Sequence, residues 1–179
     1  MDIKTNQLQA PLILFLRSNP IAPDPRVEKE ARSLSHAGYS VQILGWDRSA
    51  ALPGREDLDW AIIHRLAIRA DYARGVMNMF PLLRWQLGLQ LWLIRHASQF
   101  DVIHGCDFDT ILPALVCKWI FRKKVIYDIF DFYADHLRNT PNVLKKLIRA
   151  VDLWAIGRAD GLILVDDQRI AQVHGARFE

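Results

Sequence analysis

Short apolar segments alternate along this chain with longer segments in which apolar residues recur at helical spacing. A buried strand is predicted where a short, mostly apolar run is bounded by turn-forming residues. Six runs meet this description: PLILFLR (11–17), YSVQILGW (39–46), WAIIHRLAI (60–68), DVIHG (101–105), KKVIYDI (123–129) and DGLILVD (160–166). The polar segment between the second and third runs is predicted to be a loop.

The helical segments carry start and stop signals. The first helix is predicted to begin at Asp24, which can accept hydrogen bonds from first-turn N–H groups, with Pro25 where no N–H is needed. Gly38 is predicted to end this helix in a left-handed turn. Its buried face should carry Val27, Ala31 and Leu34. Further helices are predicted over 76–100, 110–121, 142–159 and 167–175, the third of them amphipathic through Val143, Leu147, Ala150, Val151 and Trp154.

This alternation predicts the fold class. Short strands that are apolar on both faces and alternate with helices favour an α/β domain, a Rossmann-like doubly wound parallel sheet with helices on both faces. The usual strand order, 3-2-1-4-5-6, puts the binding crevice at the carboxyl ends of the first and fourth strands. The loops 18–26 and 104–109 should meet there. We therefore expect Asn19, Arg26, Asp107 and Asp128 to gather at one edge of the sheet.

The joint after the fourth strand is rich in titratable residues. Asp107 lies just beyond the strand, where a carboxylate could bind a hydroxyl group or accept its proton. Asp109 is equally well explained as the cap of the next helix. His104, on the strand itself, is either a packed core histidine or a ligand, and Cys106 is either a packed residue or a site residue.

The first loop lacks the glycine pattern of nicotinamide, flavin or Walker-type phosphate sites. It offers instead a helix N-terminus with Asn19 and Arg26 close by, which together suit an anion. The alternative is that Arg26 only pairs with Glu30 one turn later.

The segment YDIFDFYADH (127–136) sets Asp128, Asp131 and Asp135 among aromatic residues. Carboxylates beside aromatic rings could hold a polyhydroxylated ligand, or they could simply cap a helix and line a loop. No His/Cys spacing of the zinc-binding kind is present, so no metal site is predicted.

Composition narrows the function classes. The chain has 179 residues, half of them apolar, with a net charge of +3 and a pI near 9.0. This mild basicity is too weak to indicate nucleic acid but could favour an anionic ligand or membrane surface. Two cysteines and no signal-like N-terminus favour a cytoplasmic setting.

Residues 75–100 form the least ordinary segment, because they are rich in Leu, Met and Trp and contain no acidic residue. One interpretation is a largely buried core helix with a few exposed arginines. The other is an interfacial helix that meets anionic lipid. Pro81 should start or kink the helix. The membrane-contacting residues would be Arg84, Trp85, Trp92 and Arg95.

Three segments, 24–46, 101–136 and 158–173, are together similar to the N-terminal domain of group 1 (family four) GT-B glycosyltransferases. The similarity covers nearly the whole chain, in the same order and at the usual spacing. It implies a two-domain enzyme that moves a sugar from a nucleotide-sugar donor to an acceptor with retention of configuration, without a metal or other cofactor. The N-terminal domain of that family mainly holds the acceptor, and a paired-glutamate motif of the C-terminal domain is not found in this chain.

The resemblance also implies residue roles. HGCD (104–107) matches a segment usually written His-x-His-Asp or His-x-His-Glu, with His104 as the first histidine and Asp107 as the acid. Cys106 replaces the second histidine, which leaves Asp107 as the residue expected to orient the acceptor hydroxyl.

The other matches lie in the first loop and after the fifth strand. Arg26 matches the basic position at the start of the first helix. Asp128 and Asp131 match the acidic positions of a Tyr-Asp-x-x-Glu/Asp segment at the interdomain cleft. Many members have a Gly-Gly pair where this chain has NPIAPDP (19–25), and a bulkier loop would change how the donor phosphates approach.

We expect residues 1–179 to be one acceptor-binding domain, ending before the last strand, linker and C-terminal donor-binding domain of a cytoplasmic, peripherally membrane-associated glycosyltransferase. The acceptor would be a glycan or a lipid-linked molecule. Asp107 is the expected catalytic residue, the acceptor would be bound by His104, Cys106, Asp128 and Asp131, and the donor phosphates by Asn19 and Arg26. The alternative is a stand-alone, non-catalytic binding module of the same fold. A Rossmann oxidoreductase is disfavoured by the missing glycine pattern.

Overall fold

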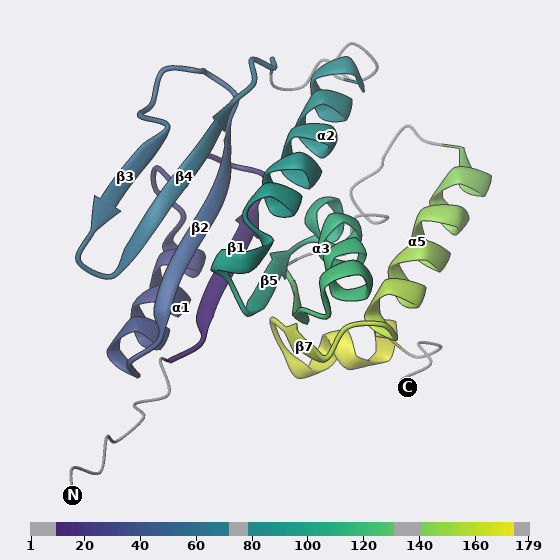
Figure 1. Ribbon diagram of the computed structural model, residues 1–179. Helices are drawn as coiled ribbons and strands as arrows, with labels where there is room; N and C mark the ends of the chain where they lie inside the picture. Colours follow the sequence, from purple (N-terminus) through teal and green to yellow (C-terminus); the bar gives the residue numbers. More distant parts are fainter. Residues whose placement is uncertain (1–9, 72–78, 131–140, 174–179) are drawn as a thin grey trace, which may run out of the picture.

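The computed structural model describes residues 10–71, 79–130 and 141–173, which form a seven-stranded sheet with helices on both faces (Figure 1). The strands are β1 (Leu12–Arg17), β2 (Ser40–Asp47), β3 (Arg55–Leu58), β4 (Ala61–Ala67), β5 (Val102–Cys106), β6 (Lys124–Ile129) and β7 (Gly161–Leu164). The helices are α1 (Pro25–His36), α2 (Met79–Arg95), α3 (Phe108–Phe121) and α5 (Asn142–Ile156), with the 3₁₀ helices η2 (Ala97–Gln99) and η3 (Asp167–Val173).

The order of strands across the sheet is β3-β4-β2-β1-β5-β6-β7. Every neighbouring pair is parallel except β3 with β4. Without β3, this is the predicted doubly wound order, so the prediction of a Rossmann-like sheet is confirmed. The strand order reverses between β1 and β5, whose carboxyl ends therefore flank the crevice of such a fold.

The edge strand β3 corrects the sequence interpretation, which assigned the whole polar segment before β4 to a loop. Arg55 to Leu58 pair antiparallel with Ala61 to His64 of β4. The side chains of β3 alternate between exposed and half-buried. An edge strand is bonded on one side only and tolerates charge there, so β3 has no apolar run by which it could be recognised.

Each face of the sheet has its own apolar core. Helix α1 packs Val27 and Ala31 against the face that carries Phe15 and Ile43. Helices α2, α3 and α5 cover the other face (Figure 1). Residues 13 to 16 of β1 are buried and supply alternate side chains to the two cores, which explains the continuous apolar run in its sequence.

The start and stop signals of α1 act as predicted. The Asp24 carboxylate accepts a hydrogen bond from the Val27 N–H, Pro25 is the first helical residue, and Gly38 has the left-handed φ of +91°. The last helix differs from its prediction, because residues 167–173 form a 3₁₀ helix rather than an α-helix.

Helix α2 has one buried and one exposed apolar side. Trp85, Leu89 and Leu93 are fully buried, at a spacing of four residues. The opposite face exposes Phe80, Leu83, Leu87, Leu91 and Ile94. Pro81 lies in the first turn that the structure describes. Within the described ranges, no helix is long and apolar enough to cross a bilayer.

Helix α5 packs through an unexpected face. Its buried residues are Asp152, Ala155 and Ile156. Of the predicted apolar stripe, Val143, Leu147 and Trp154 are exposed. The helical period of this segment was therefore predicted correctly, but the apolar stripe that it defines faces outward.

Candidate functional site

Polar residues from three strands and the first loop meet at the carboxyl edge of the sheet. Strands β1, β5 and β6 are parallel neighbours, so the residues that end them lie close together. We call the resulting group the carboxyl-edge cluster, which consists of Arg17, Asn19, Asp24, Arg26, Asp107, Asp128 and Phe130.

Arg17, the last residue of β1, organises one half of this cluster. Its Nε donates a hydrogen bond of 2.9 Å to Asp24 Oδ2, and its Nη1 pairs with Asp107 Oδ2. Asn19 Nδ2 donates to the same Asp24 oxygen at 2.6 Å. Burial opposes ionisation of Asp24, but the hydrogen bonds from Asn19 and Arg17 outweigh it and hold the pKa of Asp24 below its usual value. Asp24 is therefore both the cap of α1 and the anionic partner of Arg17.

Asp107 occupies a strained position at the junction between β5 and α3. Its φ is +67°, in a region that side-chain-bearing residues rarely adopt. The Asp107 N–H donates to the carbonyl of Asp128 at 2.9 Å, and its Oδ1 accepts from the Phe130 N–H at 2.9 Å. With 22% of its side chain exposed, this carboxylate is held by both neighbouring strands yet still reaches solvent. Backbone strain of this kind is concentrated at functional sites.

Arg26 organises the other half of the cluster. It pairs with Asp128 Oδ1 and donates from Nε to Glu30 Oε1 at 3.1 Å. The predicted pairing of Arg26 with Glu30 is present, and Arg26 also reaches the sheet; anion binding by Arg26 stays a prediction. The guanidinium carbons of Arg17 and Arg26 lie 4.2 and 3.9 Å from the centre of the Phe130 ring, which joins the two halves.

Below this edge, His104, Cys106 and Asp128 form a buried group on the face covered by α1. His104 Nε2 lies 3.3 Å from Asp128 Oδ2 and 3.6 Å from Glu30 Oε2, and its ring stacks on Phe15. Burial, followed by the nearby Asp128 carboxylate, raises the pKa of the Cys106 thiol well above its usual value. The same two causes, in the same order, raise the pKa of Glu30.

A cavity of about 810 Å³ adjoins this buried group. It lies between α1 and strands β5 to β7, and Arg26, Glu30 and His104 contribute polar walls. The rest of its lining is mostly apolar, from Ile13, Leu34, Val102, Ile126 and the β7 segment 161–165. The cavity lining does not include Asp107, so the cavity and the carboxyl-edge cluster are distinct regions that have Arg26 in common.

The structure brings together most of the residues singled out in the sequence. Asn19, Arg26, Asp107 and Asp128 all belong to the carboxyl-edge cluster. Asn19 donates to Asp24, and Arg26 donates to Glu30 and Asp128, so both side chains already bind carboxylates of the chain. Asp131 and Asp135 lie outside the described residues.

Asp109 is not the cap that the sequence suggested. Helix α3 begins at Phe108, so Asp109 lies in its first turn. Burial raises the pKa of Asp109, although a hydrogen bond with Ser18 opposes this shift. The Ser18 hydroxyl also accepts from Trp85 Nε1 at 3.0 Å.

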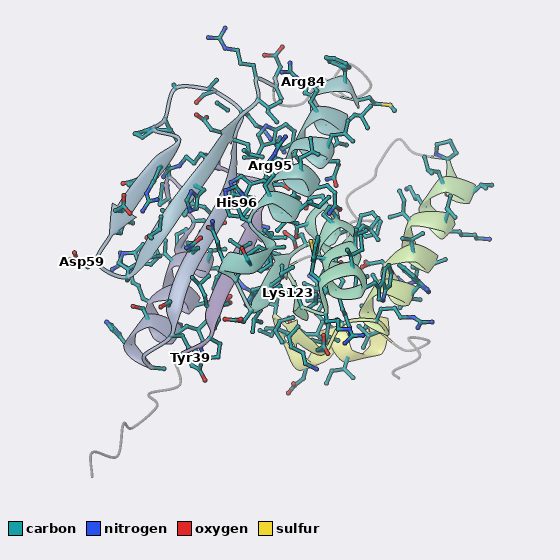
Figure 2. All side chains as sticks on the ribbon, in the orientation of Figure 1. Tyr39, Asp59, Arg84, Arg95, His96 and Lys123 are labelled. Carbon is teal, nitrogen blue, oxygen red and sulfur yellow. The ribbon has the colours of Figure 1, made fainter. Side chains whose placement is uncertain are left out.

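Two of the four residues predicted to contact a membrane belong to the packed side of α2. Trp85 is completely buried and stacks on Trp46 at 5.3 Å between ring centres, so its indole is not available to a lipid surface. Trp92 is half-buried and stacks on His96 at 4.1 Å. Arg84 and Arg95, labelled in Figure 2, are both exposed.

Arg17 is the main site residue that sequence reasoning missed. The signal available was its position, a charged residue that ends an otherwise apolar strand at the edge where the other candidates were expected. Its partner Asp107 lies 90 residues further along the chain, so no local sequence pattern connects the two residues.

Comparison with known proteins gives the fold. No protein-family model and no curated protein matches the chain. Sucrose-phosphate synthase from Thermosynechococcus elongatus matches 93% of this chain and 45% of its own, at 13% identity and a TM-score of 0.70. The catalytic domain of starch synthase IV from Arabidopsis thaliana, bound to ADP and acarbose, matches 69% of this chain and 34% of its own, at 11% identity and a TM-score of 0.55. UDP-GlcNAc 2-epimerase from Methanocaldococcus jannaschii matches 90% of this chain and 41% of its own, at 13% identity and a TM-score of 0.51.

These likenesses confirm the predicted fold class, a Rossmann-like domain of the GT-B type. The chain spans less than half the length of each of the three structures described.

Proposed function

We propose that this chain is the acceptor-binding half of a GT-B glycosyltransferase, which transfers a sugar from a nucleotide-sugar donor to a glycan or lipid-linked acceptor with retention of configuration. The observation that carries the proposal is the strained, doubly anchored Asp107 at the point where the strand order reverses. A crevice at that point is where open α/β sheets bind ligands. The likeness to sugar-handling enzymes of the same fold supports the same class of substrate.

Asp107 is the residue that meets the acceptor in this proposal. Its two oxygens are fixed by Arg17 and the Phe130 N–H, and each retains a lone pair for an acceptor hydroxyl. Because Arg17 and the backbone hold the carboxylate in place, it would orient a hydroxyl without having to reorganise. A second domain would bring the donor across the same edge, where Asn19 and Arg26 would contact its phosphates.

The buried residues have a supporting role. His104, Cys106 and Asp128 are buried, so they would shape the acceptor site from within the protein rather than contact solvent. Asp128 does so through Arg26 and through its own carbonyl, which accepts the Asp107 N–H. In this proposal no cofactor takes part in sugar transfer.

The alternative, a stand-alone binding module of the same fold, is favoured by one feature of the cluster. Arg17, Asn19 and Arg26 each donate to a carboxylate of the chain itself. A site that is complete within one domain could serve binding without transfer.

Peripheral attachment to an anionic membrane is a further part of the proposal. Helices α2, α3 and α5 lie next to one another, and Trp119 of α3 contacts Trp154 of α5 at 5.7 Å between ring centres (Figure 1). We call the solvent-facing side of these three helices the outer helical face. Its exposed apolar residues include Phe80, Leu83, Leu87, Leu91, Ile94, Trp119, Ile120, Val143, Leu147 and Trp154.

The charges of the outer helical face suit an anionic surface. The basic residues of its helices are Arg84, Arg95, Lys118, Lys145, Lys146 and Arg149. Their acidic residues are Asp109, which is half-buried, and Asp152, which is buried. Apolar side chains flanked by basic ones are the pattern by which amphipathic helices bind anionic lipid.

Binding of sugars to the purified chain tests the function. Saturation-transfer NMR with a panel of oligosaccharides, nucleotide sugars and NAD should give signals from sugar protons and none from NAD. The Asp107→Asn variant should lose the acceptor signals, whereas Asp59→Asn, on the exposed turn between β3 and β4, should keep them. Signals from NAD alone, or sugar signals unchanged by Asp107→Asn, would refute the proposal. Sugar transfer by the isolated 179 residues would contradict the assignment of this chain to the acceptor half.

A further inference from the structure

Four side chains with metal-binding atoms converge on the α1 face of the sheet. His104 and Cys106 are two residues apart on β5 and therefore project from the same face. Asp128 is the register partner of Cys106 on β6. One ligand atom from each of these three lies within 4.8 Å of those from the other two. Glu30 of α1 approaches from above, with its Oε2 at 3.6 Å from His104 Nε2.

We propose that His104, Cys106, Asp128 and Glu30 bind a single zinc ion. The donor set, one imidazole nitrogen, one thiolate and two carboxylates, consists of the ligand types that zinc uses in proteins. Sequence spacing does not reveal this site, because only the pairing of β5 with β6 and the packing of α1 bring the four residues together.

The two distances from His104 Nε2 to the carboxylate oxygens fit tetrahedral coordination. Nitrogen and oxygen ligands lie about 2.0–2.1 Å from zinc, so two of them at tetrahedral positions are about 3.3–3.4 Å apart. His104 Nε2 is 3.3 Å from Asp128 Oδ2 and 3.6 Å from Glu30 Oε2. A zinc-bound sulfur would lie about 3.6 Å from each nitrogen or oxygen ligand. Cys106 Sγ lies within 4.8 Å of the ligand atoms of His104 and Asp128, so zinc binding would draw it toward them by about 1 Å.

Glu30 supplies an independent indication of a missing partner. Its Oε2 atom is buried and has no hydrogen-bond partner among the described residues. A buried carboxylate oxygen without a partner is costly, and a metal ion would satisfy it. The other oxygen, Oε1, accepts from Arg26 and would keep that bond.

The charges also balance around a divalent ion. Ionised Asp128, ionised Glu30 and the Cys106 thiolate carry three negative charges, and Zn²⁺ with the Arg26 guanidinium matches them. Binding would displace the thiol proton of Cys106 to solvent. Arg26 pairs with Asp128 Oδ1, which leaves Oδ2 for the metal, and the stacking of Phe15 on His104 fixes the imidazole plane.

A zinc ion could reach the site from solvent, and it would link helix α1 to the sheet. Glu30 and His104 line the cavity of about 810 Å³ on this face, through which a metal could enter. Once bound, zinc would tie α1 to β5 and β6 directly beneath the carboxyl-edge cluster. This inference does not depend on sugar transfer, and its test measures metal binding alone.

Metal titration of the full chain tests the site. After dialysis against a chelator, the protein should bind one equivalent of Zn²⁺, with a rise in Tm. Co²⁺ in its place should give tetrahedral visible bands and a near-ultraviolet thiolate-to-metal charge-transfer band. Cys106→Ser should lose the charge-transfer band, whereas Cys117→Ser, which removes the other buried cysteine, should keep it. Glu30→Gln should weaken Zn²⁺ binding by roughly tenfold or more.

Two results of the metal titration would overturn the zinc site. No stoichiometric zinc, or a charge-transfer band that survives Cys106→Ser, would overturn the site. If Cys106→Ser does not fold, Glu30→Gln decides, because Glu30 lies at the surface of the cluster and its loss should leave the sheet intact. Unchanged zinc affinity in Glu30→Gln would remove Glu30 from the ligand set and contradict the four-ligand proposal. Loss of sugar binding with zinc binding retained would count against the proposed function and not against this site.

Discussion

Arg17 and Asp107 lie 90 residues apart in the chain, yet their side chains form an ion pair that joins the ends of β1 and β5. The same guanidinium donates to Asp24 at the start of α1. One arginine therefore fixes the proposed catalytic carboxylate, the first loop and the first helix relative to one another. Arg17 therefore connects the most distant parts of the carboxyl-edge cluster.

Removal of Arg17 should destabilise the fold. Arg17→Ala leaves the carboxylates of Asp24 and Asp107 without their cation, and we expect the free energy of unfolding to fall by about 2–3 kcal/mol, less than for a fully buried pair because Arg17 is partly exposed. Urea unfolding followed by circular dichroism measures this change. The control Arg55→Ala breaks an exposed ion pair with Asp57 and should leave the midpoint unchanged. Equal effects of the two variants would contradict the role of Arg17.

Gly45 of β2 leaves no room for a side chain, so a substitution there should destabilise the fold. A Cβ atom at this position would lie 2.7 Å from the backbone oxygen of Asn19, and that oxygen already accepts from the Trp46 N–H at 2.9 Å. Gly45→Ala should therefore push the first loop away and cost about 1–3 kcal/mol of stability. The matched variant is Gly54→Ala, whose Cβ would meet nothing closer than 3.9 Å. Thermal unfolding of the two proteins compares them, and a stable Gly45→Ala protein would show that the loop can move freely.

The sheet was predictable because its strands are buried on both faces and so appear as apolar runs. The same rule fails for β3, whose edge position requires no such run. It also fails for α5, where helical spacing identified the helix but not the side that packs: Asp152 is buried and Val143 is exposed. Sequence periodicity shows that a helix has an apolar side, but only tertiary packing decides whether that side faces the core or the solvent.

The candidate site was predictable only in part, for a related reason. The topology alone places the ends of β1, β5 and β6 at one edge, which located the group Asn19, Arg26, Asp107 and Asp128. Strand register and helix packing were needed to bring Asp128 opposite Cys106 and Glu30 above His104. Contacts of this kind join residues far apart in the chain, and no spacing in the sequence encodes them.

The buried pair Tyr127 and Asp152 predicts an unusual pH dependence. The Tyr127 hydroxyl donates to Asp152 Oδ1 at 2.6 Å, yet burial raises the pKa of Asp152 above its usual value. A carboxyl group with a raised pKa in the folded state costs stability as the pH rises through its unfolded value, about 3.9, and beyond. Asp152→Asn should therefore raise the free energy of unfolding at neutral pH and have little effect in acid. Urea unfolding across this pH range measures the difference.

Asp47 is the control for Asp152, because its pKa is shifted in the opposite direction. Burial opposes its ionisation, but hydrogen bonds from Ser49, Leu52 and Ala51 outweigh it and lower the pKa of Asp47. The stabilisation that this provides is present above the unfolded pKa and lost as the pH falls through the folded one. Asp47→Asn should accordingly destabilise the protein at neutral pH and matter less in acid. If both asparagine variants shifted stability in the same direction at neutral pH, the explanation by burial and hydrogen bonding would fail.

The two sides of α2 should respond to mutation in different ways. Trp85, which is 0% exposed, stacks on Trp46, and Trp85→Ala should cost about 3–5 kcal/mol of stability.

Leu87 is 56% exposed, so Leu87→Asp should leave the fold intact but abolish flotation with phosphatidylglycerol vesicles at low salt. Tyr39→Asp, at an exposed position away from the outer helical face, should float like the unmodified chain. Binding should weaken with salt and be absent from phosphatidylcholine vesicles, because salt screens the attraction between the basic residues of this face and anionic lipid, and phosphatidylcholine carries no net charge. An unmodified chain that stays at the bottom of the gradient in low salt would eliminate the membrane surface, whereas flotation by Leu87→Asp would move the contact elsewhere on the molecule.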